Sequence, residues 1–118
     1  MFSSLLIVLA SETYHVRGRE KLTKFAQSKT IESGNTMENH FCSVCGSLMY
    51  RISSAYPDLL IARIGMVDDF NLHETLLKPR LEVYTRDRVC WYEGVKGAKQ
   101  CVDGNVTLTL SENDSGKI

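Results

Sequence analysis

The sharpest chemical feature of this sequence is a pair of cysteines, Cys42 and Cys45, separated by two residues and followed by Gly46. At this spacing both sulfurs can reach one zinc ion, which lies about 2.3 Å from each sulfur in protein sites. Gly46 suits the tight turn that such a site requires, because a residue without Cβ readily takes left-handed backbone angles. The pattern therefore predicts a zinc knuckle in which Cys42 and Cys45 are metal ligands.

Two other interpretations of the pair remain open. A redox-active Cys-x-x-Cys usually begins a helix, whose N-terminus lowers the pKa of a thiol, whereas residues 46–52 are strand-like. The pair could also be two buried thiols without a role. The flanking residues Phe41 and Leu48 belong to apolar strands, so the pair is expected at the tip of a β-hairpin. This placement favours the zinc knuckle over a small thiol-redox protein.

A structural zinc needs four ligands, and the other candidates in the sequence are weaker. Cys90 and Cys101 are close to the C-terminal end and are expected to be stray thiols. His40 precedes Cys42 by two residues and would share its face of a regular strand. A lone strand histidine is more often simply hydrogen-bonded than a metal ligand. Two further histidines have no motif around them and are expected at the surface or in a second layer: His15 and His73.

Short strands must position this turn. Apolar runs or alternating apolar and polar residues predict them at residues 5–10, 14–16, 22–25, 37–41, 47–52, 59–65 and 81–85. Only residues 87–93 suggest a weak helical turn. Many short strands separated by turns predict an all-β fold, a sandwich of short antiparallel strands with the cysteine pair at a hairpin tip. We expect residues 1–101 to form one domain and residues 102–118 to form a flexible tail.

Composition excludes several classes of protein. The 118 residues contain 14 basic and 14 acidic side chains, and zero net charge argues against a general nucleic-acid binder. No apolar run reaches the roughly 18 residues of a membrane span. The apolar residues 5–10 lack a preceding basic stretch and are few for a signal peptide. We therefore expect a reducing, cytoplasmic compartment, where cysteines are thiols or metal ligands rather than disulfides.

Over residues 4–100 the sequence resembles the glutathione-dependent formaldehyde-activating enzyme family, also called the centromere protein V/formaldehyde-activating domain. The resemblance rests on Phe-Cys-Ser-Val-Cys-Gly at residues 41–46 together with Gly-Met-Val-Asp-Asp at residues 65–69. Similar stretches at residues 14–16, 21–25, 33–37 and 78–80 support it. The resemblance implies a zinc-bearing β-fold, the β-tent. It also implies carbon–sulfur lyase chemistry, which joins formaldehyde to glutathione as S-hydroxymethylglutathione.

The resemblance further implies that Cys42 and Cys45 are the second half of a structural zinc site. In the family, the first half and a separate catalytic zinc use cysteines nearer the N-terminus, and no cysteine precedes Cys42 here. We therefore expect an N-terminally shortened member that does not catalyse the reaction by itself. The alternative is a non-catalytic zinc-binding or protein-interaction module.

No catalytic residue is assigned from the sequence. The candidates for contact with a small thiol substrate such as glutathione are Tyr50, Arg63, Asp68, Asp69 and Arg80. Single charged residues on strands are usually part of a solvated face, so each of them has a plainer interpretation. Two other aromatic residues, Phe70 and Trp91, are expected in the core.

Overall fold

The structure is a computed structural model that describes residues 4–29 and 34–104. The chain divides into two compact units, Met1–Asp68 and Asp69–Ile118. Each unit has its own sheet. The interpretation of residues 1–101 as a single domain stays a prediction. The tail predicted at residues 102–118 lies, from residue 105 onward, outside the described residues.

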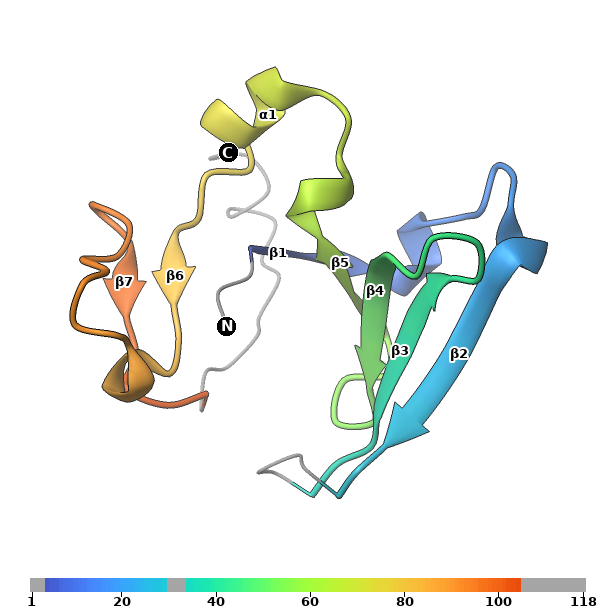
Figure 1. Cartoon of the computed structure of the whole chain (residues 1–118), viewed down its shortest axis with the longest axis horizontal. Coiled ribbons are helices and arrows are strands. Elements are labelled where there is room, and N and C mark those ends of the chain that lie inside the picture. The colour runs from blue at the N-terminus through green and yellow to red at the C-terminus, as the bar shows by residue number, and fades with distance from the viewer. Residues whose placement is uncertain (1–3, 30–33, 105–118) are drawn as a thin grey trace. The chain divides into compact units, whose positions relative to one another are not determined.

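The first unit contains a five-stranded antiparallel sheet with the order β1-β5-β4-β3-β2 (Figure 1). Its strands are β1 (Leu5–Leu9), β2 (Leu22–Gln27), β3 (Met37–Cys42), β4 (Leu48–Ser53) and β5 (Leu59–Arg63). Three 3-10 helices accompany them: Ala10–Glu12, Arg19–Lys21 and Ile64–Met66. The register is fixed by pairs such as Leu22 opposite Cys42, and Ile7 opposite Ile61. Strand β3 lies between β2 and β4.

Alternation along β3 gives the sheet two chemically different faces, because successive side chains of a strand point to opposite sides. One side, called here the Cys42 face, carries Glu38, His40 and Cys42. The other side, the Asn39 face, carries Met37, Asn39 and Phe41. A register shift in the pairing with β4 falls between His40 and Phe41. Because of this alternation, the thiol of Cys42 and the amide of Asn39 lie on opposite faces of the sheet.

Strand side chains in the first unit are mostly half-buried. Among the described hydrophobic residues of the whole chain only Ile64 and Leu77 are buried, at 6% and 8% exposure. Several large apolar side chains remain exposed, including Phe25 on β2 at 56%. Both faces of the sheet therefore keep side chains that a ligand can reach.

The second unit contains the short helix α1 (Phe70–Glu74) and a parallel pair of two-residue strands, β6 (Leu81–Glu82) and β7 (Lys99–Gln100) (Figure 1). A 3-10 helix, Thr85–Asp87, lies between these strands in the sequence. The carboxylate of Glu82 fastens the pair, because it accepts hydrogen bonds from Arg88 (3.0 Å), Val95 N (3.1 Å) and Gln100 Nε2 (2.7 Å).

The mostly β fold with a cysteine pair at a hairpin tip is confirmed, and five predicted strands match within two residues. The apolar run at residues 5–10 is strand β1, paired with β5. Two predictions of secondary structure were wrong. Residues 14–16 form no strand, and Tyr14 and Val16 are 84% and 82% exposed. The helix α1 was not predicted, and the helical turn expected at residues 87–93 is instead the 3-10 helix Thr85–Asp87.

The expectation that Phe70 and Trp91 lie in the core was also wrong, since they are 80% and 74% exposed. Phe70 begins a helix of five residues, and its ring lies against His73 with the ring centroids 5.3 Å apart. Trp91 lies in a turn between β6 and β7. Neither short segment offers a second apolar layer, so aromatic character alone does not bury these side chains.

No helix within the described residues is long and apolar enough to cross a membrane.

Candidate metal centre

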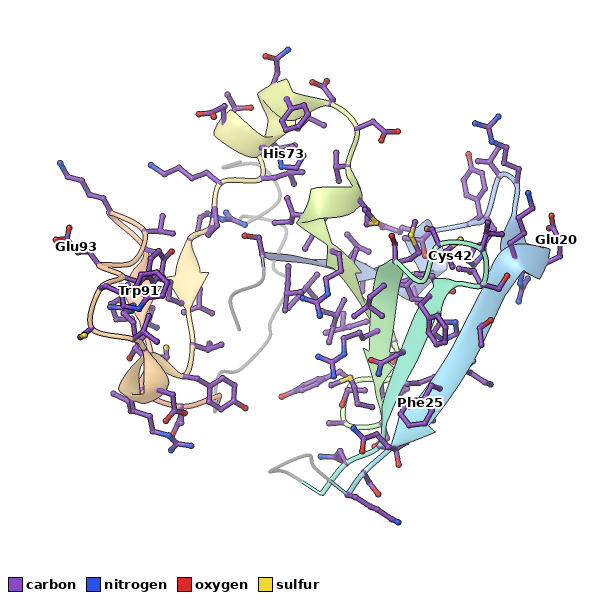
Figure 2. All side chains as sticks on the ribbon, viewed as in Figure 1. Glu20, Phe25, Cys42, His73, Trp91 and Glu93 are labelled. Atoms are coloured by element: carbon purple, nitrogen blue, oxygen red, sulfur yellow. The ribbon has the colours of Figure 1, made fainter. Side chains whose placement is uncertain are left out.

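The hairpin between β3 and β4 holds the cysteine pair, and Cys42 is labelled in Figure 2. Strand β3 ends at Cys42, and β4 begins at Leu48. The turn is closed by two backbone hydrogen bonds: Cys42 N donates to Ser47 O at 2.9 Å, and Gly46 N donates to Cys42 O at 2.8 Å. Gly46 has a φ of 78°, the left-handed conformation expected from its place in the motif. The turn therefore folds Cys45 back toward Cys42.

A third backbone hydrogen bond ties this turn to its neighbour in the sheet. Ser43 N donates to Lys21 O at 2.8 Å, and Lys21 directly precedes β2. Leu22, the first residue of β2, is paired with Cys42. The turn is thus held by its own hairpin and by the adjacent strand, which fixes the position of Cys42 before any ligand binds.

The two thiols differ in exposure and in acidity. Cys42 is half-buried and Cys45 is exposed. The Cys45 Sγ lies 3.3 Å from Ser47 Oγ. Hydrogen bonds with the Ser47 side chain first, then with the Ser47 backbone and with Cys42, hold the pKa of the Cys45 thiol below its ordinary value. A lowered thiol pKa favours the thiolate, which is the form that binds metals.

The donor set fits part of a zinc site. Two neighbouring thiols, one of them with a lowered pKa, suit two of the four positions of a tetrahedral zinc. Within residues 4–29 and 34–104, no group of three or more His, Cys, Asp and Glu side chains is arranged to hold a metal ion. The geometry therefore supplies a two-thiol half-site, and the assignment of Cys42 and Cys45 as ligands stays a prediction.

His40 shares the face of Cys42 and is hydrogen-bonded, as expected for a lone strand histidine. Its Nε2 lies 2.6 Å from Glu38 Oε1. Its ring stacks on Tyr50 of the neighbouring strand, with the ring centroids 4.5 Å apart and the planes at 18°. The two contacts of the imidazole are thus with Glu38 and Tyr50, and not with the cysteines.

Tyr50 connects this cluster to a distant part of the sequence. Its hydroxyl lies 3.1 Å from Nε2 of His15, which is exposed as predicted. Burial is the main cause that raises the pKa of Tyr50, while the charge of Arg19 opposes the shift and that of Glu38 adds to it. The phenol therefore stays protonated at neutral pH. The Cys42 face thus carries two imidazoles, a phenol and a carboxylate beside the strand that ends in Cys42.

The other candidates from the sequence belong to different elements of the two units. Arg63 is half-buried on β5, whereas Asp68 and Arg80 are exposed. Asp69 caps helix α1, because its Oδ1 accepts a hydrogen bond from Asn71 N at 3.0 Å. His73 is half-buried, in agreement with the expected surface or second-layer position.

All four cysteines are free thiols. Cys90 and Cys101 belong to the second unit, and each is outside the turn that joins Cys42 with Cys45. Sequence reasoning missed Glu38 as the partner of His40. The two-residue spacing between them on a strand was the signal that could have identified it.

The first unit thus combines a mostly antiparallel β-sheet with a Cys-x-x-Cys turn at a hairpin tip. A sequence model of the family described as glutathione-dependent formaldehyde-activating enzyme matches residues 1–87. The chain therefore belongs to this family, which is zinc-associated and of the carbon–sulfur lyase type. Comparison with curated proteins gives no match, and comparison with solved structures gives none either.

Proposed function

We propose that this chain is a zinc-binding protein of the carbon–sulfur lyase type, in which Cys42 and Cys45 hold a structural zinc. The observation that carries the proposal is the β3–β4 turn, which brings two thiols together and lowers the pKa of Cys45. Family membership supports glutathione and formaldehyde as the reactants. Their joining forms a bond between the glutathione sulfur and the formaldehyde carbon, and the former carbonyl oxygen takes up a proton.

The residues of the chain have separate tasks in this proposal. Cys42 is fixed by backbone hydrogen bonds at the end of β3, and Ser47 favours the thiolate of Cys45. Gly46 supplies the left-handed backbone that the turn requires. Zinc bound between the thiolates would neutralise their charge and cross-link the turn, which couples metal binding to the stability of the fold.

A thiol-redox function is less well supported. The low thiol pKa of redox Cys-x-x-Cys motifs depends largely on a helix that begins at the motif. Here the turn leads into strand β4, which begins at Leu48. The hydrogen bonds of Ser47, rather than a helix N-terminus, account for the lowered pKa of Cys45.

Metal content tests the assignment of the ligands. Purified wild-type chain, Cys42→Ser, Cys45→Ser and Cys90→Ser would each be loaded with zinc, desalted and analysed by plasma mass spectrometry. Cys42→Ser and Cys45→Ser should both lose zinc, whereas Cys90→Ser is the matched control and should keep it. An equal loss in Cys90→Ser would mean that the wrong ligands are assigned.

Adduct formation tests separately whether the cysteine turn is itself catalytic. Zinc-loaded chain would be mixed with formaldehyde and glutathione, and the rate compared with a control without protein. The resemblance assigns catalysis to a second zinc, so we expect no acceleration by this chain alone. A saturable acceleration lost in Cys42→Ser would show that the knuckle itself is catalytic. Zinc binding without acceleration would also fit the alternative of a non-catalytic zinc-binding module.

A further inference from the structure

Two arginines lie close together on the Asn39 face, opposite the face that carries Cys42. Arg51 of β4 is paired with Ile61 of β5, and Arg63 follows Ile61 by two residues. Side chains two residues apart on a strand share a face, so Arg51 and Arg63 are diagonal neighbours across the two strands. Both are half-buried. The sheet thus places two positive charges side by side where water screens them incompletely.

Neither charge is compensated within the described residues. Arg51 Nε donates a hydrogen bond to Asn39 Oδ1 at 2.8 Å, which orients the guanidinium, and no carboxylate among residues 4–29 and 34–104 pairs with its charge. In the described part of the first unit, the carboxylate ion pairs are those of Glu38 with Lys24 and His40. Burial first, and the charge of Arg63 second, lower the pKa of Arg51. Two neighbouring guanidinium groups are well suited to a carboxylate, which they can bind through paired hydrogen bonds.

An apolar hollow adjoins the arginine pair. It has a volume of about 470 Å³ and is lined by Phe25, Asn39, Phe41, Gly46 and Leu48. The hollow is shallow and largely open to solvent. Asn39 belongs to both features, because it lines the hollow and accepts the hydrogen bond from Arg51. Asn39 therefore connects the hollow with the guanidinium of Arg51 on the same face of the sheet.

We propose that the Asn39 face binds an organic carboxylate with an apolar chain, whose carboxylate lies on Arg51 and Arg63 and whose chain lies against Phe25, Phe41 and Leu48. The positive charge of the two arginines favours an anion, and the apolar lining of the hollow favours a ligand that also has an apolar chain. This site goes beyond the proposed function and does not depend on zinc. It lies on the face of the sheet opposite Cys42, so its success or failure is independent of the metal assignment.

Octanoate is a suitable probe, because it combines one carboxylate with a short apolar chain. The full chain would be titrated with octanoate by calorimetry at low ionic strength, below the concentration at which octanoate forms micelles. Octanamide keeps the chain without the charge, and phosphate keeps an anion without the chain. Both should bind at least about tenfold more weakly than octanoate, because each lacks half of the recognition.

Substitutions locate the site. Arg63→Gln and Arg51→Gln should each weaken octanoate binding about tenfold or more, since each removes a charge-assisted hydrogen bond. Phe25→Ser should weaken it less, because this ring is more than half exposed. Arg17→Gln is the matched control: it removes one positive charge from an exposed position of the same unit. Its affinity should stay within about twofold of wild type.

The wild-type protein provides a readout that needs no variant. Octanoate should shift the NMR resonance of the Arg51 Nε–H group, which remains informative if Arg51→Gln does not fold. Absence of saturable octanoate binding would overturn the proposal. Equal affinities of Arg63→Gln and Arg17→Gln would overturn it as well. Sedimentation of a dimer that Phe25→Ser dissociates, without octanoate binding, would assign the face to a second copy of the chain instead.

Discussion

Replacing Gly46 by alanine tests the turn that brings the two thiols together. The φ of Gly46 is 78°, and a Cβ built at this position meets no atom within 4 Å. The cost of Gly46→Ala is therefore conformational and not steric. A residue with a side chain pays about 1–2 kcal/mol for the left-handed conformation. The free energy of unfolding should fall by this amount, and each kcal/mol corresponds to a loss of about 4–8 °C in Tm for a small domain.

Gly65 provides the matched control for this substitution. It belongs to the same unit, has no atom within 4 Å of a built Cβ, and has no left-handed φ. Gly65→Ala should therefore be neutral, or stabilising by up to about 1 kcal/mol, because alanine restricts the unfolded chain. Gly46→Asn should recover part of the loss, since asparagine tolerates left-handed angles better than alanine does.

Urea denaturation of the zinc-free protein, followed by circular dichroism, measures all three variants on one scale. The slope of the transition should stay constant, because the surface exposed on unfolding is unchanged. An unchanged midpoint for Gly46→Ala would refute the reasoning, since the left-handed turn would then be absent in solution. Equal losses for Gly46→Ala and Gly65→Ala would refute it too, because the cost would not come from φ.

Three further predictions concern titratable groups. Ser47→Ala should shift the pH profile of Cys45 alkylation upward, because Ser47 makes the largest contribution to the lowered pKa of Cys45; an unchanged profile, resolved by peptide mass spectrometry, would contradict this. The raised pKa of Tyr50 contributes stability that is fully present below pH 10.0 and is lost as the pH rises through the folded-state pKa. Tyr50→Phe should therefore unfold less steeply with alkali than wild type, and an identical alkaline loss would count against the buried phenol. The lowered pKa of Glu82 contributes stability that is present above pH 4.5 and is lost as the pH falls through the folded-state pKa. Urea midpoints measured from pH 7 down to pH 3 should thus fall less for Glu82→Gln than for wild type, and parallel curves would exclude this contribution.

Local features of the fold could be predicted from the sequence, because their causes are local. The position of Gly46 after the cysteine pair indicates a left-handed turn, and its φ of 78° confirms this. Strand β3 was predicted within one residue from its sequence pattern. Residues 14–16 have strand-like composition but no strand forms there. A strand requires a neighbour that completes its hydrogen bonds, and composition does not identify that neighbour.

The surroundings of the cysteines were less predictable, because they depend on pairing between distant segments. The hydrogen-bonded state of His40 was expected, and the stacked Tyr50 depends on the register of β3 against β4. The contact between His15 and Tyr50 joins residues 35 positions apart in the sequence. The role proposed for Arg51 was not predicted from the sequence, because it depends on the proximity of Arg63 on the neighbouring strand and not on residues near Arg51 in the sequence.

The β3–β4 hairpin links the two proposed sites, although they use opposite faces of the sheet. Cys42 lies on one face of β3, and Asn39 lies on the other. Gly46 closes the turn around the thiols and also lines the apolar hollow. Strain at Gly46 should therefore reach both sites, whereas the loss of charge in Arg63→Gln should affect carboxylate binding and leave the cysteine turn intact. Zinc content and octanoate affinity should therefore both be measured in Gly46→Ala and Arg63→Gln. These measurements distinguish an effect of the turn on both sites from an effect on one face only. If zinc content fell in Arg63→Gln as much as in Gly46→Ala, the division of functions between the faces would be wrong.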